Sequence, residues 1–181
     1  MNKIFYLAFS GLIMLAAGIF LLLSDTLGIE NIKIIVPALI FVSGVSAIIF
    51  SNYEKLPTIA KKYHVAQGLG LIVFAACIAT IPDSLKSFLM VTTYFVIMYG
   101  LFEIIFAFGV LGSNHKINKG IMMSRIIAGA LNLLGGFVLL LSSLQNETTG
   151  LTIAGVLIIL AGSSVAIFAA KLRNMELPES N

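Results

Sequence analysis

Residues 88–111 read FLMVTTYFVIMYGLFEIIFAFGVL, and Glu103 is the only charged residue among them. A helix rises about 1.5 Å per residue and the hydrocarbon core of a bilayer is about 30 Å thick, so about 20 apolar residues cross it. A lipid-facing barrel strand would alternate apolar and polar residues, which this stretch does not do. The stretch therefore predicts a transmembrane helix.

Five further stretches have the same character: Ile4 to Leu23, Ile34 to Phe50, Val65 to Ile81, Ile121 to Leu141 and Leu151 to Ala170. The chain has 181 residues, of which 59% are hydrophobic and 10% charged. Soluble domains are roughly 45–50% apolar and about 25% charged. The sequence thus predicts an all-α polytopic membrane protein with six transmembrane helices in a single domain, residues 1–181. The first stretch is too long for a cleaved signal peptide, so we expect it to stay as an anchor.

The composition also argues against several function classes. A net charge of +3 is too small for a nucleic-acid-binding surface, and one cysteine with two histidines is a poor basis for a metal site. No P-loop, G-x-S-x-G, H-E-x-x-H or C-x-x-C motif is present. We expect a protein that is not an enzyme and has no cofactor or metal. The expected partners are the lipid bilayer and a second copy of the chain or another membrane protein.

The basic residues predict the orientation, because Lys and Arg near the ends of spans stay on the cytoplasmic side. One side would hold Lys3, Lys55, Lys61, Lys62, Lys116, Lys119, Arg125, Lys171 and Arg173, and the other only Lys33 and Lys86. This bias predicts a multi-pass membrane protein with both termini in the cytoplasm.

Glycines recur along the chain at related positions. A glycine followed seven residues later by a small residue appears as Gly11 with Gly18, Gly70 with Cys77, and Gly129 with Gly136. A G-x4-I-F pattern begins at Gly44, Gly100 and Gly162. We interpret these as three parallel two-helix hairpins, about residues 1–53, 63–114 and 121–174, related by a pseudo-threefold axis. The glycines are predicted to let neighbouring helices pack closely.

Two of these segments support a family resemblance. Residues 100–108, GLFEIIFAF, and residues 125–136, RIIAGALNLLGG, resemble the HdeD-like short-repeat membrane protein family. The resemblance covers nearly the whole chain. It implies an inner-membrane location and a link to acid stress, and it brings no known reaction or ligand.

Three polar residues break the repeat. In the other two copies Glu103 is replaced by Ala47 and Val165, Arg125 by Leu7 and Ala66, and Asn132 by Met14 and Val73. A carboxylate at the bilayer centre costs roughly 2.5 to 3.5 kcal/mol on insertion scales, so Glu103 should face the bundle interior and be paired.

Helical spacing brings the candidate residues onto two faces. One stripe is formed by Arg125, Gly129, Asn132 and Gly136, and the other by Thr92, Val96, Tyr99 and Glu103. We predict a Glu103–Arg125 ion pair with Asn132 and Tyr99 as hydrogen-bond partners. Such a pair is either a structural device that fixes the register of two helices or part of a proton path. For the outer half of such a path the chain offers Thr92, Thr93, Tyr94 and Gln67, with Asp83 at the mouth.

Two other features have simpler interpretations. His64 and His115 lie beside basic loops, so we expect solvated interfacial side chains, with sensing of cytoplasmic acidification as the alternative. Pro37 is expected in the first turn of its helix.

Two functions remain open from the sequence. The first is a non-enzymatic membrane protein linked to acid or envelope stress, acting through its fold or through protein partners. The second is a small transporter or channel with a polar site at Glu103, Arg125 and Asn132. They differ in whether these residues line a water-accessible cavity or are sealed between helices.

Overall fold

The computed structural model describes the whole chain except residues 1–2, 55, 57, 113–118, 144–145 and 174–181. The described secondary structure consists of the helices α1 (Ile4–Leu22), α2 (Ser24–Leu27), α3 (Ile29–Ser51), α4 (Thr58–Thr80), α5 (Leu85–Leu111), α6 (Lys119–Ser143) and α7 (Glu147–Arg173). All but α2 are long and apolar enough to cross a membrane. The prediction of an all-α polytopic membrane protein is confirmed.

Two helices begin five or more residues earlier than the sequence predicts. Helix α4 begins at Thr58 rather than Val65, because its first two turns are too polar to count as a span but still have a buried side that carries Tyr63 and His64. Helix α3 begins at Ile29 rather than Ile34, so Pro37 lies inside the helix and not in its first turn. The expectation for Pro37 was therefore wrong. Helix α2 was not predicted, and it ends at Leu27, just before Gly28, whose φ of 80° suits glycine.

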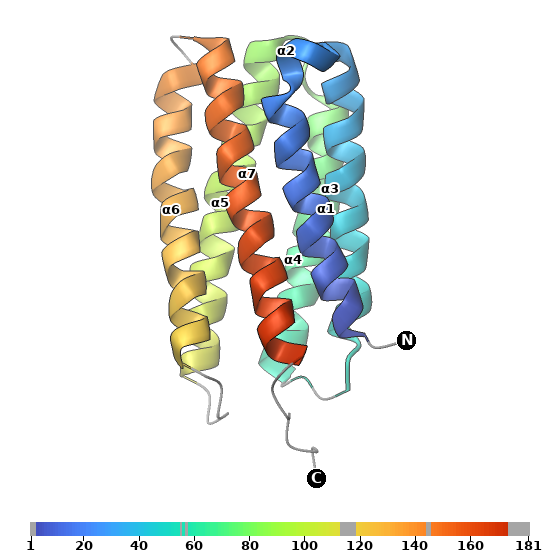
Figure 1. Cartoon of the computed structure of the whole chain (residues 1–181), viewed down its shortest axis with the longest axis vertical. Helices are drawn as coiled ribbons and strands as arrows, with labels where there is room; N and C mark the ends of the chain where they lie inside the picture. Colours follow the sequence, from blue (N-terminus) through green and yellow to red (C-terminus); the bar gives the residue numbers. More distant parts are fainter. Residues whose placement is uncertain (1–2, 55, 57, 113–118, 144–145, 174–181) are drawn as a thin grey trace.

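The long helices form one upright bundle in which the start of α1 and the end of α7 lie at the same end, opposite α2 (Figure 1). The most extensive contacts join α1 to α7, α3 to α4, and α5 to α6. The first and the last helix of the chain are therefore neighbours.

Each of these three helix pairs meets at a pair of glycines. A Cβ added at Gly11 would lie 2.8 Å from the carbonyl oxygen of Gly162, and one added at Gly44 would lie 2.8 Å from that of Gly68. At Gly100 the added Cβ would lie 2.6 Å from the carbonyl oxygen of Gly129. Because lipid provides no hydrophobic drive for helix association, this close backbone packing holds the pairs together.

The remaining predicted packing glycines have different outcomes. Gly18 faces Gly155 across the α1–α7 interface, and Gly136 packs against the side chain of Ile97. Gly70 is not at a close crossing: an added Cβ would meet only Phe102 within 4 Å, at 3.9 Å. The residue of α4 at the crossing is Gly68, two positions earlier. The three-hairpin repeat stays a prediction, which the three related glycine crossings support.

Candidate functional site

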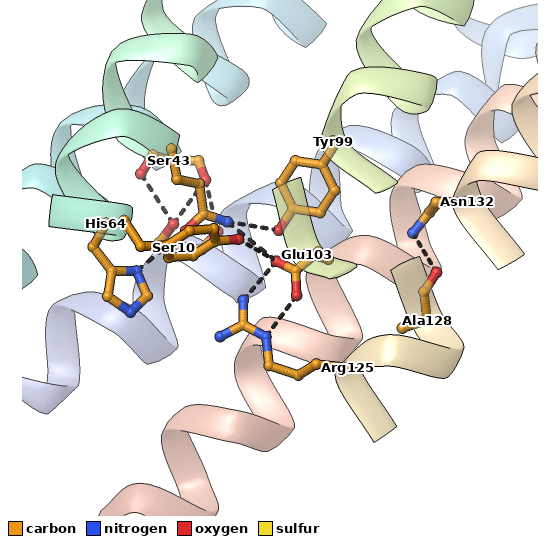
Figure 2. A network of polar contacts seen from close by, with 10 residues as sticks. Ser10, Ser43, His64, Tyr99, Glu103, Arg125, Ala128 and Asn132 are labelled. Atoms are coloured by element: carbon orange, nitrogen blue, oxygen red, sulfur yellow. Dashed lines mark hydrogen bonds and ion pairs between the residues drawn. The ribbon is translucent and has the colours of Figure 1, made fainter. Parts of the chain in front are cut away.

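Glu103 of α5 and Arg125 of α6 form a bidentate ion pair inside the bundle (Figure 2). The Nε atom of Arg125 donates to Oε2 of Glu103 and Nη2 donates to Oε1, each over 2.5 Å. Both residues are 0% exposed. The predicted pairing of these two side chains is present in the structure.

Helix α4 adds neutral donors to the same carboxylate. The hydroxyl of Tyr63 donates to Oε1 of Glu103 over 3.2 Å, and Nε2 of Gln67 donates to the same oxygen over 3.3 Å. Gln67 also donates to the hydroxyl of Tyr99 over 3.0 Å, and its Oε1 lies 3.2 Å from Nδ1 of His64. The polar cluster, defined as Tyr63, His64, Gln67, Tyr99, Glu103 and Arg125, therefore joins α4, α5 and α6.

Aromatic rings enclose the charged end of Arg125. Its guanidinium carbon lies 4.5 Å from the ring centroid of Phe106 and 4.6 Å from that of Phe168, which is on α7. Tyr63 stacks on Phe106 with ring centroids 4.0 Å apart. Cation–π contacts of this kind stabilise a desolvated guanidinium by about 2 kcal/mol. The rings also separate the ion pair from lipid and from bulk solvent, since both charged side chains are fully buried.

The glycine crossing between α5 and α6 explains how the short glutamate reaches its partner. A Cβ added at Gly129 would lie 3.0 Å from the Cβ of Glu103. Glu103 lies one turn beyond Gly100, and Arg125 lies one turn before Gly129. The backbone approach that the glycines permit therefore brings the two charges together.

The predicted stripes are both buried: Thr92, Val96, Tyr99 and Glu103 on α5, and Arg125, Gly129, Asn132 and Gly136 on α6. Tyr99 joins the polar cluster through Gln67. The prediction for Asn132 was wrong, because its Nδ2 donates to the carbonyl of Ala128 on its own helix over 3.1 Å. Asparagine in a helix often bonds to the preceding turn in this way, and here that bond keeps it out of the polar cluster (Figure 2).

Tyr63, His64 and Gln67 are the members that the sequence analysis missed. His64 is 0% exposed, not solvated, and its ring packs between Phe50 and Phe106. Gln67 was expected in the outer half of a proton path, and in the structure it lies beside Glu103. The sequence does contain a signal for His64. If the repeats are aligned on Gly68 instead of Gly70, His64 lies four residues before its glycine, as Arg125 lies four residues before Gly129. His115 lies outside the described residues.

Among the described residues, the polar side chains predicted for an outer half of a proton path do not extend the polar cluster. The hydroxyls of Thr92 and Thr93 donate to the carbonyls of Phe88 and Leu89 on the same helix, each over 2.8 Å. Tyr94 is 57% exposed on the outer surface. Beside Gln67 and Tyr99 lies a cavity of about 10 Å³ with otherwise apolar and glycine walls, which is room for one water molecule at most.

Within the described part of the chain, no group of three or more His, Cys, Asp and Glu side chains is placed to hold a metal ion. Comparison with protein-family models, with curated proteins and with solved structures finds no match.

Proposed function

We propose that this chain is a non-enzymatic membrane protein whose polar cluster is a structural clasp between α4, α5 and α6. The observation that carries the proposal is that Glu103 and Arg125 are wholly buried and bound to each other through two hydrogen bonds. Burying two charges is costly, and a mutual, well-aligned pair offsets that cost. A pair of this kind fixes which faces of two helices meet.

We further propose that both termini lie in the cytoplasm, on the distribution of the basic residues, and that the membrane is the inner membrane, on the resemblance to the HdeD-like family. The start of α1 and the end of α7 lie at one end of the bundle, which agrees with an even number of spans (Figure 1). The test is labelling of single cysteines with a membrane-impermeant maleimide in intact cells, in a Cys77→Ala background. Lys86→Cys should be labelled and Lys119→Cys should not; the reverse result would invert the orientation.

The physiological role that we propose is in the response to acid or envelope stress, through the fold itself or through protein partners. This part rests on the resemblance of residues 100–108 and 125–136 to the HdeD-like family. It predicts that cells lacking the gene survive acid shock less well and that the wild-type chain restores survival. Equal survival with and without the gene, under both acid and envelope stress, would remove this role.

The second candidate is a small transporter or channel centred on Glu103 and Arg125, since intramembrane charges often mark ion paths. The sealed aromatic surroundings and the cavity of about 10 Å³ favour the clasp over this candidate. A transport path would have to bring water or solute to Glu103.

The deciding experiment measures proton flux into proteoliposomes under an imposed pH gradient, with thermal unfolding of the same samples. Wild type is compared with Glu103→Gln, which removes the buried charge, and with Glu147→Gln, a matched change at the exposed start of α7. We expect no flux above empty liposomes in any sample. Glu103→Gln should unfold roughly 10 °C lower, from about 3 kcal/mol lost with one partner of a buried pair, while Glu147→Gln matches wild type.

The opposite pattern would establish the transporter. Flux in wild type and in Glu147→Gln that disappears in Glu103→Gln, without loss of thermal stability, would overturn the clasp.

A further inference from the structure

Two buried nitrogen atoms of the polar cluster lack a hydrogen-bond partner among the described residues: Nε2 of His64 and Nη1 of Arg125. Both groups pack against Phe106, with the His64 ring centroid 5.4 Å and the Arg125 guanidinium carbon 4.5 Å from its centroid. In Figure 2 the unbonded nitrogen of Arg125 points to the side on which His64 lies. Unpaired buried polar atoms are costly, so the two nitrogens need partners.

The charge of Glu103 determines which way the amide of Gln67 faces. A carboxylate can only accept hydrogen bonds, so the Gln67 atom that lies 3.3 Å from Glu103 must be the NH₂ nitrogen. The amide oxygen then faces Nδ1 of His64, 3.2 Å away. Because that oxygen can only accept, Nδ1 of His64 must carry the hydrogen.

The charge balance determines the state of the other His64 nitrogen. The titratable and charged groups nearest His64 are Tyr63 on its own helix, whose ring it contacts, and Arg125 on α6. Glu103 and Tyr99 on α5 are linked to it through Gln67. The charges of Glu103 and Arg125 cancel, so a protonated His64 would leave a net buried charge. A neutral His64 with its hydrogen on Nδ1 has a lone pair on Nε2. That nitrogen is therefore an acceptor.

We infer that Nε2 of His64 and Nη1 of Arg125 bind one internal water molecule between them. The water would donate to the lone pair of His64 and accept from the N–H of Arg125. A cation is disfavoured by the donor of Arg125, and an anion is disfavoured by the lone pair of His64. The two nitrogen atoms therefore select a small neutral molecule that can both donate and accept a hydrogen bond.

This water closes the polar cluster into a ring that runs from His64 through Gln67, Glu103 and Arg125 back to His64. Internal waters of folded proteins typically serve such groups, with about three hydrogen bonds each. The ring would satisfy both unpartnered nitrogens without adding charge to the interior.

Nitrogen NMR of ¹⁵N-histidine-labelled protein in lipid bilayers tests the inference. His115→Gln leaves His64 as the single histidine. We expect a neutral imidazole with the hydrogen on Nδ1, unchanged from about pH 5 to 8, the range in which an ordinary histidine changes charge. Magnetisation transferred from water should reach Nε2.

A hydrogen on Nε2, an imidazolium in that pH range, or no transfer from water would each overturn the inference. An imidazolium whose signal depends on chloride would indicate an anion site instead. The second variant, Gln67→Met in the His115→Gln background, removes the acceptor that fixes Nδ1–H. Its spectrum should then show the Nε2–H form, and an unchanged tautomer would contradict the role of Gln67.

The inference depends on the geometry of the polar cluster and not on the clasp. A failed NMR test leaves the flux and unfolding comparison of Glu103→Gln intact. A finding of proton flux in turn leaves the tautomer of His64 to be measured.

Discussion

The α1–α7 and α5–α6 interfaces share a glycine crossing and differ one turn beyond it. Between α1 and α7 the crossing is Gly11 with Gly162, and the next buried side chains are Leu7 and Val165. Between α5 and α6 the crossing is Gly100 with Gly129, and the corresponding positions hold Arg125 and Glu103. The backbone contact is therefore general to the bundle, whereas the charged pair marks one interface as distinct. We interpret the charge as a device for specificity and not for net stability.

The largest effect should come from making the charged interface resemble the apolar one. Glu103→Val and Arg125→Leu separately should each cost about 3–5 kcal/mol of unfolding free energy, because each leaves a buried unpaired charge. The double variant should cost about 1–3 kcal/mol, since only Tyr63 and Gln67 then lose their acceptor. Unfolding in mixed detergent micelles measures all three.

The matched control for this comparison is the double-mutant cycle itself. A double variant as unstable as the sum of the two single variants would show that Glu103 and Arg125 are not energetically coupled.

The next largest effect should come from alanine substitutions at the glycine crossings, which both interfaces share. Gly11→Ala and Gly100→Ala should each cost about 1–3 kcal/mol, because the new Cβ would lie 2.6 Å from Ala166 N and from Gly129 O, respectively. Gly70→Ala is the control, since its Cβ meets only Phe102 at 3.9 Å. It should be neutral or stabilise by up to about 1 kcal/mol through helix propensity. Equal losses at all three positions would contradict the assigned crossings.

A smaller effect is expected where α1 meets α3 without charges. Ser10 Oγ lies 3.0 Å from the carbonyl oxygen and 2.8 Å from Oγ of Ser43, and Ser43 Oγ lies 3.1 Å from the Ser10 carbonyl oxygen. Ser10→Ala should cost about 0.6–1 kcal/mol, the usual scale of an interhelical hydrogen bond in membranes. Ser46→Ala is the control, because Ser46 bonds only within its own helix, to Val42. A larger loss at Ser46 would contradict this assignment.

The smallest effect concerns a surface carboxylate near the start of α5. Hydrogen bonds from Ser87 and Ser84 hold the pKa of Asp83 below its usual value. Its contribution to stability is therefore present above the unfolded pKa of about 3.9 and is lost as the pH falls through the lower folded pKa. The stability difference between wild type and Asp83→Asn should shrink on acidification below about pH 4. A difference that grows there would contradict the assigned direction.

Hydropathy was sufficient to predict the six spans, because a bilayer imposes a long apolar run on each crossing helix. It was insufficient for the polar beginning of α4, where Tyr63 and His64 are buried although Lys61 and Lys62 lie beside them. The pair of Glu103 with Arg125 was predictable because charges inside a span need partners. The contribution of α4 to the polar cluster was not predictable in the same way. The repeat spacing selected Gly70 as the packing glycine of α4, whereas α3 and α4 meet at Gly68.

Asn132 shows a different limit of the sequence. It shares a stripe with Arg125, and the structure confirms that this stripe is buried. Its amide nevertheless bonds to Ala128 in the preceding turn. Position on a helix face predicts burial, whereas the choice between a backbone and a side-chain partner depends on local geometry.

The contact between α1 and α7 has a consequence for biosynthesis. The partners α3 and α4 follow each other on the ribosome, as do α5 and α6, but Gly11 is made roughly 150 residues before Gly162. At about 5–20 residues per second, α1 waits roughly 10–30 s for the helix that covers its glycine face. The nascent chain therefore carries one unmatched small-residue surface in the bilayer until translation is nearly complete. Premature termination before α7 would leave that surface open to misassembly and to membrane quality control.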